Sequence, residues 1–315
     1  SQRKQRVIKL VKEELHMRSR NIVFVEPNVA KLVEENIELP KENEVQVKLL
    51  CSTISSGTER ANLMGSKTVA WNQPEAKEAE FPRRVGYSSS GIIIKVGKGV
   101  VDYKEGDRVA LSWSKHSEII NMNIKNVHKL DEDISFSDGA MAHIATFPLA
   151  AVRKCHLEVG ESAIVMGMGI LGMIAVQLLK VSGATPIIAV DPDEKKREKA
   201  LLIGADYALD PYANDFVQRV KQITNSGAKV GIEVTGVGAA LDGILDLNNT
   251  SIENGTYTCR VVVYANNESG KNVFTYSRDA RIPMWGVRKT EINLAYGAEN
   301  EIEDIYFATC KVRGV

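Results

Sequence analysis

The chain has 315 residues, of which 44% are hydrophobic and 25% are charged, and 40 basic residues balance 40 acidic ones. This length suits two domains, and the neutral balance excludes a general attraction to nucleic acid or to an acidic membrane. A small molecule is therefore the expected partner. The sequence contains no apolar stretch near the roughly 20 residues of a membrane span. It also lacks the pattern of a secretory signal, so we expect a cytoplasmic protein.

Residues 1–20 are basic, with apolar side chains at helical spacing. This pattern predicts an amphipathic helix ahead of the first domain. Such a helix either packs on the body of the protein or binds a membrane surface or a partner. An alternative start for the core domain is Met17.

Residues 21–136 are expected to form a β-rich domain, because short, often alternating apolar runs are separated there by turn residues. The expected strands include 22–25, 30–39, 44–50 and 91–96. The polar, proline-bearing stretch 68–82 is expected to be a loop.

From residue 137 onward the pattern changes to helices alternating with strands, which predicts a parallel sheet with helices on both faces. The expected helices are 138–153, 170–183, 193–203 and 214–225. The expected strands are 163–166, 186–190, 206–209, 230–234 and 259–264, with a further candidate at 284–287. The fold class is therefore α/β, with a doubly wound, Rossmann-type domain over residues 137–288.

The run Gly167-Met168-Gly169-Ile170-Leu171-Gly172 is a GxGxxG motif between an expected strand and an expected helix. Gly167 permits the tight turn, Gly169 lets the backbone approach a pyrophosphate, and Gly172 lets helix and strand pack closely. The N–H groups that open the helix would bind the phosphates. Asp191 ends the next strand, where its carboxylate can accept hydrogen bonds from the adenosine ribose. The motif predicts a dinucleotide cofactor.

Asp191 also indicates which cofactor, because its charge would repel a 2′-phosphate and so favours NAD. Lys195, Lys196 and Arg197 follow closely and keep NADP open as an alternative, unless they form a solvated helix face. Val234-Thr235-Gly236 ends a later strand, at the edge where such sheets bind ligands. We expect this turn to border the nicotinamide half of the site.

The chain resembles the medium-chain dehydrogenase/reductase superfamily, whose best-known members are the zinc alcohol dehydrogenases. The resemblance rests on the turn 96–100 (Val-Gly-Lys-Gly-Val) and the run 106–109 (Gly-Asp-Arg-Val) ahead of the GxGxxG domain, and it spans roughly residues 21–284. It implies a GroES-like catalytic domain over 21–136, NAD(P)-dependent dehydrogenase activity, and a homodimer or homotetramer. It also implies that residues 289–315 return to the first domain, with 306–312 as one returning strand.

The zinc ligands of that superfamily are replaced here. Zinc members carry Cys-Gly-Thr-Asp where this chain has Ser56-Gly57-Thr58-Glu59, and Gly-His-Glu where it has Gly86-Tyr87-Ser88. At the place of the third ligand it has Ala145-Thr146-Phe147-Pro148, and the resemblance places Thr146 near the cofactor. A site that needs three protein ligands lacks a thiolate and an imidazole, so we expect no zinc. The runs that begin at Ser56 and at Gly86 resemble a zinc-lacking branch that includes bacteriochlorophyllide-type dehydrogenases and two-domain oxidoreductases.

Without zinc, another group must stabilise or protonate the substrate oxygen. Tyr87 is a candidate because a phenol can donate a hydrogen bond or a proton, the alternative being a packing role. Ser56 and Glu59 occupy the other former metal-shell positions, and Thr58 is a candidate proton relay. Glu59 has an alternative role in an ion pair with Arg60 that holds the loop.

Two functions remain open from the sequence. The first is a zinc-independent, NAD(H)-dependent oxidoreductase acting on an alcohol, a ketone or a conjugated carbonyl. The second is a dinucleotide-binding sensor or scaffold without turnover, an alternative that the replaced zinc ligands favour. The intact glycine turn and Asp191 favour the enzyme.

Overall fold

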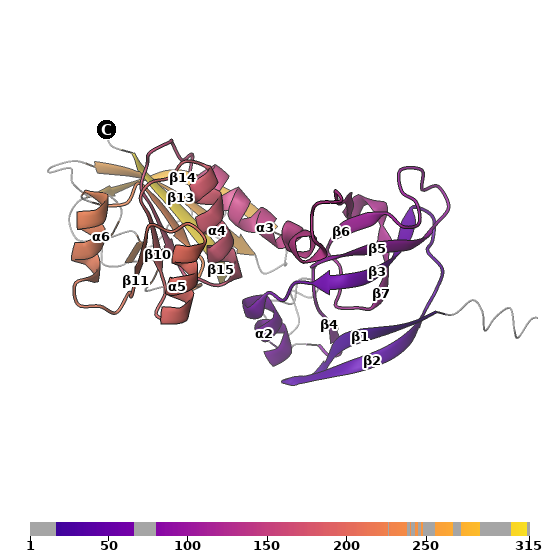
Figure 1. Cartoon of the computed structure of the whole chain (residues 1–315). Coiled ribbons are helices and arrows are strands. Elements are labelled where there is room, and N and C mark those ends of the chain that lie inside the picture. The colour runs from indigo at the N-terminus through magenta and orange to yellow at the C-terminus, as the bar shows by residue number, and fades with distance from the viewer. Residues whose placement is uncertain are drawn as a thin grey trace, which may run out of the picture. The chain divides into compact units, whose positions relative to one another are not determined.

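The computed structural model describes residues 17–65, 80–225, 227–237, 240, 243, 244 and 247, and the strands at 256–266, 272–283 and 304–313 (Figure 1). These residues form two compact units that divide between Ala145 and Thr146. The helix expected over the first 16 residues, most of the expected loop and the candidate strand 284–287 lie outside the described residues. None of the helices in the described part has the length and apolar character that crossing a bilayer requires.

The first unit begins with a small antiparallel sheet in the order β2-β1-β4. Its strands are β1 (Met17–Glu26), β2 (Val29–Ile37) and β4 (Arg83–Arg84). Residues 17–20 were expected to end the N-terminal helix, but they belong to β1. Pairing with β2 explains the difference, because β1 then buries alternate side chains such as Ser19 and Asn21 on one face.

Five further antiparallel strands form the second sheet of this unit, in the order β7-β3-β5-β6-β8. They are β3 (Glu44–Ser52), β5 (Ser88–Val96), β6 (Arg108–Ser112), β7 (Ile119–Asn123) and β8 (Val127–Lys129). Seven buried apolar side chains form its core: Val45, Val47, Ile93, Val109, Leu111, Met122 and Val127. This is the β-rich domain expected from the alternating apolar runs.

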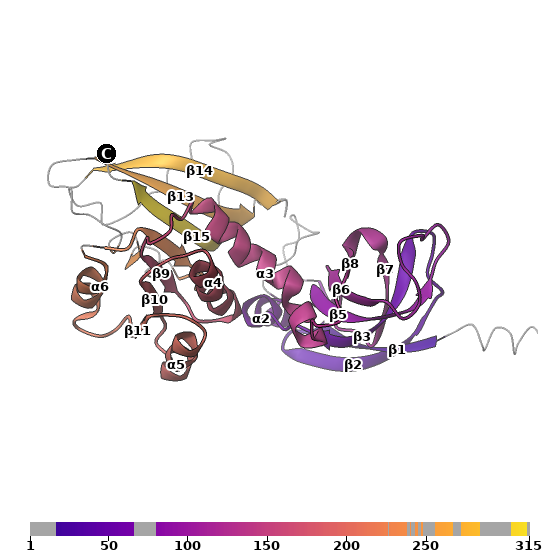
Figure 2. The same ribbon diagram turned by 45° about the horizontal axis from the view of Figure 1, so that its top comes forward.

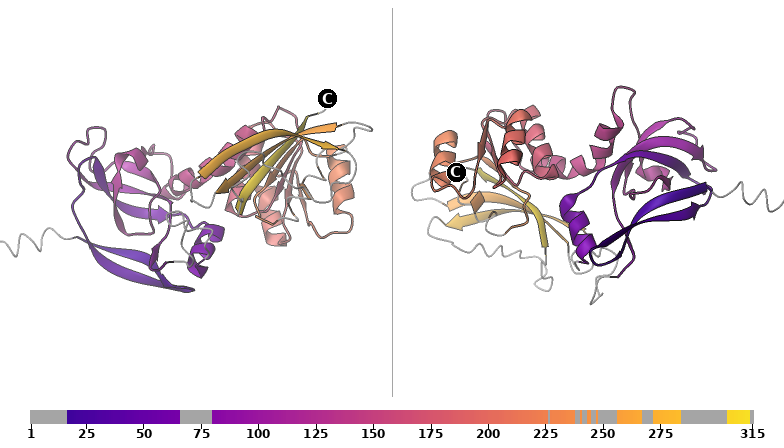
Figure 3. Two further views of the ribbon diagram at one scale, coloured as in Figure 1. Left: turned by 180° about the vertical axis from the view of Figure 1, so that it is seen from behind. Right: turned by 60° about the horizontal axis from the view of Figure 1, so that its bottom comes forward.

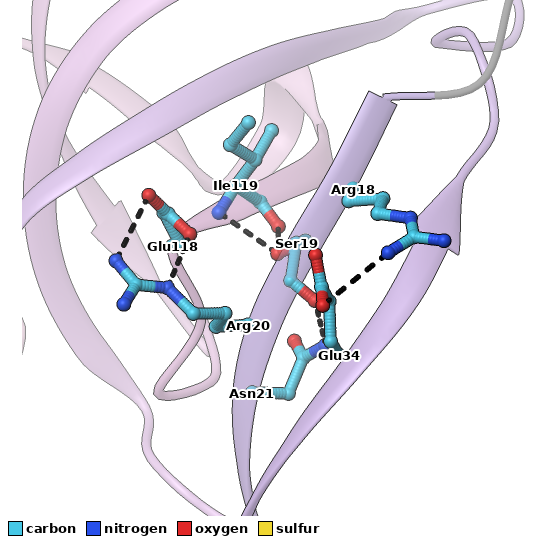
Figure 4. Close-up of polar contacts among 7 residues, drawn as sticks. All are labelled: Arg18, Ser19, Arg20, Asn21, Glu34, Glu118 and Ile119. Atoms are coloured by element: carbon cyan, nitrogen blue, oxygen red, sulfur yellow. Dashed lines mark hydrogen bonds and ion pairs between the residues drawn. The ribbon is translucent and has the colours of Figure 1, made fainter.

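Ser19 joins the small sheet to β7 (Figure 4). Its hydroxyl donates to the Ile119 carbonyl at 2.7 Å and accepts from the Ile119 N–H at 3.0 Å. Next to it, Arg20 binds Glu118 through Nε at 2.9 Å, and Arg18 lies 3.5 Å from Glu34. The Ser19 and Arg20 contacts link β1 to the segment that leads into β7.

Helix α3 (Phe136–Lys154) starts in the first unit and continues into the second. Its first turns are held by hydroxyl groups, because Ser88 and Thr53 both donate to the Ala140 carbonyl, at 2.6 and 2.7 Å. Ser90 donates to the carbonyl of Phe136. The domain boundary expected at residue 136 thus falls inside a continuous helix.

The second unit contains a seven-stranded sheet in the order β11-β10-β9-β12-β15-β13-β14. Its parallel part consists of β9 (Ala163–Met166), β10 (Ile187–Val190), β11 (Tyr207–Leu209) and β12 (Val230–Glu233). The helices between these strands are α4 (Ile170–Val181), α5 (Glu194–Leu202) and α6 (Phe216–Thr224), seen around this part of the sheet in Figure 2. This is the expected Rossmann-type arrangement, and the strands β9, β10 and β12 are buried throughout.

The remaining strands are antiparallel: β13 (Thr256–Asn266), β14 (Asn272–Pro283) and β15 (Asp304–Arg313) (Figure 3). The strand expected at 306–312 is present, but β15 pairs with β12 and β13 instead of returning to the first unit. The strand expected at 259–264 lies within β13, which does not continue the parallel pattern. Pairing with β15 satisfies the backbone groups that β12 would otherwise leave open along one side.

Candidate functional site

The glycine motif lies at an edge of the sheet where three strands end in register. Met166, the last residue of β9, pairs with Val190 of β10 and with Glu233 of β12. Since these strands are parallel, the segments that follow them emerge at the same edge, where α/β sheets bind ligands. The glycine turn, Asp191 and the Val234–Gly236 turn therefore meet there.

Each glycine of the motif suits its position for a different structural reason. Gly167 has a φ of +98°, and a Cβ on it would lie 2.8 Å from the Thr235 side chain. A Cβ on Gly172 would lie 1.8 Å from the Gly167 carbonyl oxygen, so only glycine lets α4 start this close to the turn. Gly169, the N-cap of α4, is exposed, and a Cβ there would meet nothing within 4 Å. The N-terminus of α4 therefore faces open space.

The N–H groups of the first helical turn border that space. Ile170 and Leu171 are half-buried and open α4, and Gly169 has no side chain to cap them. Unpaired N–H groups and the positive end of the helix dipole are suited to an anion such as a pyrophosphate.

Asp191 ties the glycine turn to the start of α5. Its side chain is buried, and its two oxygens accept from the N–H of Met168 at 2.8 Å and of Asp193 at 2.9 Å. The ammonium of Lys196 lies 3.7 Å from the same carboxylate. A carboxylate offers about four acceptor sites, so the group retains capacity for ribose hydroxyls.

The basic residues after Asp191 differ in their surroundings. Arg197 donates through Nη1 to the carbonyl oxygens of Asp191 at 2.7 Å and of Pro192 at 2.8 Å. It also lies 3.8 Å from Asp210. Lys195 is exposed, as expected for a solvated helix face. Arg197 is therefore already engaged by the backbone of the loop that carries Asp191.

The turn after β12 is shaped by Glu233, which the sequence did not single out. Its side chain is 1% exposed and accepts from the N–H of Thr235 at 2.5 Å, from the Thr235 hydroxyl, and from the N–H of Gly236 at 3.3 Å. Burial raises the pKa of Glu233. Thr235 then packs against Gly167, so Glu233 acts on the glycine turn through Thr235. The sequence signal that could have identified Glu233 was a single acidic residue at the end of an apolar strand.

Two of the expected cofactor residues have no defined role in this geometry. Val234 is half-buried and packs against the apolar core of the second unit. Thr146 is exposed on α3, and its place near a cofactor stays a prediction.

Three residues at the positions where the resemblance implies replaced zinc ligands, Ser56, Thr58 and Glu59, lie on helix α2 (Ser56–Met64), which the sequence did not predict. Ser56 is exposed, Thr58 is half-buried, and Glu59 is the only buried residue of the helix. An apolar stripe is therefore missing from α2, which explains why hydrophobic periodicity did not reveal it.

Glu59 forms a buried ion pair or hydrogen bond with His116, and not the ion pair with Arg60 that we considered. The Glu59 Oε1 atom lies 2.9 Å from Nε2 of His116, and Nδ1 of the same ring lies 2.9 Å from the Ser52 hydroxyl. His116 is 6% exposed, and Ser52 is exposed. Ser52 and His116 were missed because they are distant in sequence and fit no motif.

Tyr87 is half-buried beside this group. Its hydroxyl interacts with the side chains of Ser55 and Thr58. The Ser55 hydroxyl donates to that of Thr58 at 3.3 Å. Burial raises the pKa of Tyr87, and the charge of Glu59 adds to this effect. The structure thus brings three of the four expected catalytic residues together: Tyr87, Thr58 and Glu59.

Aromatic rings surround the Tyr87 side chain. His143 meets it edge-on with ring centroids 5.9 Å apart, and Trp113 lies at 6.3 Å. His143 and Trp113 are themselves 4.7 Å apart. His143 is half-buried in this cluster, and burial lowers its pKa. The cluster keeps the Tyr87 ring in place.

Comparison with known proteins gives matches for both units. The alcohol dehydrogenase GroES-like domain family matches residues 41–175, and the zinc-binding dehydrogenase family matches residues 171–270. D-guloside 3-dehydrogenase of Escherichia coli (strain K12) is 30% identical over 244 residues, which cover 72% of this chain and 69% of that protein. (R,R)-butanediol dehydrogenase of Bacillus subtilis (strain 168) is 29% identical over 236 residues, or 66% of this chain and 68% of that protein.

Solved structures show the same fold. The crystal structure of 2R,3R-butanediol dehydrogenase from Bacillus subtilis superposes with a TM-score of 0.64 at 25% identity, covering 73% of this chain and 74% of that one. ECK1772 of Escherichia coli, described as an oxidoreductase/dehydrogenase of unknown specificity, gives a TM-score of 0.65 at 21% identity, covering 74% of each chain.

Proposed function

Because this chain belongs to the medium-chain dehydrogenase/reductase superfamily of oxidoreductases, we propose that it transfers hydride between NAD(H) and a secondary alcohol or its ketone without zinc. The observation that carries the proposal is the glycine turn with open space at Gly169 and the carboxylate of Asp191 in register beside it.

The residues of the turn fit a nicotinamide dinucleotide. A Cβ at Gly169 meets nothing, so a pyrophosphate has room to reach the N–H groups of Ile170 and Leu171. Asp191 would accept from the ribose hydroxyls and exclude a 2′-phosphate. Arg197, the best candidate partner for such a phosphate, is bound to backbone carbonyls, which supports NAD over NADP. When bound, the nicotinamide supplies the hydride acceptor or donor.

The donor set supports a reaction without zinc. Ser56 and Tyr87 present hydroxyl groups where zinc members have a thiolate and an imidazole. Within the described ranges, no three His, Cys, Asp or Glu side chains are grouped so that they could hold a metal ion. Catalytic zinc sites need three such protein ligands, so these residues do not fit the ion.

Tyr87 is the proposed proton donor to a ketone oxygen, and its phenolate is the proton acceptor in alcohol oxidation. Its neutral form is favoured by burial, and the hydroxyls of Ser55 and Thr58 orient it and supply a route for the proton. The exposed Ser56 hydroxyl would bind a second oxygen of a polyol substrate.

The relatives support a polyol as the substrate class. The names D-guloside 3-dehydrogenase and (R,R)-butanediol dehydrogenase describe oxidation of a hydroxyl in a sugar derivative and in a diol. Neighbouring hydroxyls of such a substrate suit a site rich in Ser, Thr and Tyr oxygens. As in the superfamily, we propose a homodimer or homotetramer, which mass photometry of the purified protein would check.

A single set of measurements on the purified protein tests the proposal. NADH and NADPH are titrated by fluorescence, zinc is measured by mass spectrometry, and turnover is followed on sugar glycosides, diols, ketones, quinones and enones. We expect NADH binding, no stoichiometric zinc, and oxidation of a diol or glycoside. Binding without turnover on any substrate would favour the sensor, and stoichiometric zinc would contradict the role given to Tyr87.

A further inference from the structure

Helix α2 is anchored by a buried polar side chain. Its nine residues bury only Glu59, so apolar packing contributes little to its position. Near its C-terminal end, the Leu63 carbonyl accepts a hydrogen bond from the N–H of Asn28 at 2.8 Å, and this bond holds that end of the helix. The position of its first turn must therefore depend strongly on what binds Glu59.

His116 is the group that binds Glu59, and its own position is fixed by the backbone. Its N–H donates to the Val85 carbonyl at 2.9 Å, and its carbonyl accepts from the N–H of Ile22 at 2.9 Å. A Cβ on Gly86 would lie 2.8 Å from the backbone nitrogen of His116, so the backbone of His116 has no room to shift toward Gly86. The ring is then held at both nitrogens, by Glu59 and by Ser52.

The first turn of α2 also carries the partners of Tyr87. Thr58 directly precedes Glu59, and Ser55 is the N-cap of the helix. The Ser55 hydroxyl does not cap the helix; it contacts Thr58 and Tyr87 instead. A displacement of Glu59 would therefore move both hydroxyls away from the phenol.

We propose that His116 is a positioning residue: by binding Glu59 it fixes the first turn of α2, and so holds Ser55 and Thr58 against the Tyr87 hydroxyl. The inference rests on the proposed function only in its effect on turnover, since all of these groups belong to the first unit. Its competitor is an electrostatic role, in which the charge of Glu59 acts on Tyr87 directly. Lys115 also interacts with Glu59.

Two variants distinguish the positioning role of His116 from a charge effect of Glu59, and a third variant is the control. His116→Phe keeps a ring of similar size but binds neither Glu59 nor Ser52. Glu59→Gln keeps an oxygen that accepts from Nε2 of His116 but removes the charge. The matched control is His128→Phe, because His128 is an exposed histidine that also contacts a serine, with Nε2 3.1 Å from the Ser112 hydroxyl.

We expect His116→Phe to lower kcat for ketone reduction by about 10- to 100-fold, since small displacements of catalytic groups cost this much. The KM and Kd for NADH should not change, His128→Phe should keep the wild-type turnover, and Glu59→Gln should lose less turnover than His116→Phe. Glu59→Gln falling as far as His116→Phe would overturn the proposal in favour of a charge effect. The proposal would also be overturned if His116→Phe kept the same turnover as the His128→Phe control.

A second readout does not depend on turnover. In protein labelled with ¹³C at tyrosine, the Tyr87 signal is assigned by its loss in Tyr87→Phe. We expect this signal to shift in His116→Phe and to stay in place in His128→Phe; no shift would overturn the proposal. If wild-type protein reduces no substrate, the proposed function fails, and this signal still decides on His116.

The His116→Phe variant leaves the Glu59 carboxylate buried without its partner, which is strongly destabilising. If it does not fold, the double variant Glu59→Gln/His116→Phe replaces it, because an uncharged amide carries a smaller penalty. The double variant should show the same loss of turnover and the same shift of the Tyr87 signal, although Glu59→Gln alone does not. A double variant equal to Glu59→Gln would overturn the proposal.

Discussion

Gly172 approaches Gly167 so closely that a Cβ on Gly172 would stand 1.8 Å from the Gly167 carbonyl oxygen. This contact sets where α4 begins relative to β9, and so where the N-terminus of the helix presents its N–H groups. Gly169, between these two glycines, has free space in front of it. The first contact is a requirement of the fold, whereas the proposed function assigns the second feature to the ligand.

The two glycines should therefore respond differently to substitution by alanine. We expect Gly172→Ala to lower the free energy of unfolding by about 1–3 kcal/mol, the usual cost of overpacking, because the clashing atom is backbone. Gly169→Ala should unfold like wild type, since φ is −78° and the space is open. It should nevertheless bind NADH at least about tenfold more weakly, or about 1.4 kcal/mol. Urea unfolding and fluorescence titration measure the two effects, and wild-type NADH affinity in Gly169→Ala would show that the pyrophosphate binds elsewhere.

Removing the charge of Asp191 should change cofactor choice. In Asp191→Asn one of the two backbone N–H groups of Met168 and Asp193 loses its acceptor, and a ribose hydroxyl loses a charged partner. We expect NADH affinity to fall about tenfold and the ratio of NADPH to NADH affinity to rise. Parallel titrations with both cofactors measure this, and an unchanged ratio would mean that Asp191 serves only the loop.

Tyr87→Phe should lower kcat for ketone reduction by about 10²- to 10⁴-fold, the contribution typical of a general acid, with NADH affinity unchanged. Burial raises the pKa of Tyr87 above its ordinary value of 10.0, so the neutral phenol persists at and below that pH. Reduction should therefore decline only above about pH 10, and this decline should vanish from the residual activity of Tyr87→Phe.

The control for this prediction is Tyr103→Phe. Tyr103 lies in the same unit and donates to the Val127 carbonyl at 2.6 Å, not to the Ser55 and Thr58 hydroxyls beside Tyr87. We expect its turnover to match that of wild type. Equal turnover in Tyr87→Phe and Tyr103→Phe would remove Tyr87 as the proton donor.

Glu233 should make stability depend on pH. Burial raises its folded-state pKa above the ordinary value of 4.5, so the folded protein prefers the neutral carboxyl. Its contribution to stability is complete below the unfolded-state pKa and is lost as pH rises through the raised folded-state pKa. The free energy of unfolding of wild type relative to Glu233→Gln should thus decrease with increasing pH from about 4.5 upward. Urea unfolding at several pH values measures this difference, with Glu105→Gln on an exposed loop as the control substitution, and an increase with pH would contradict the prediction.

Local patterns determined much of the second unit from the sequence. The strands β9, β10 and β12 are short and buried throughout, and glycines with defined geometric roles follow β9. The positions of Gly169 and Asp191 could be predicted for the same reason, because a turn, a helix start and a strand end are all local features. That Ser56 and Tyr87 stand in place of zinc ligands rests on the resemblance and stays a prediction.

Contacts between distant segments could be decided only by the tertiary structure. Helix α2 was not predicted because its one buried residue is an acid, and Glu59 found its partner in His116 through a fold that brings β3 and the segment after β6 together. Likewise, β15 carries an ordinary strand pattern, but only the pairing with β12 and β13 shows which sheet it joins. Hydrophobic periodicity specifies which face of an element is buried. It contains no information about the partner, because the hydrogen bonds between Glu59, His116 and Ser52 depend on where separate elements come to lie.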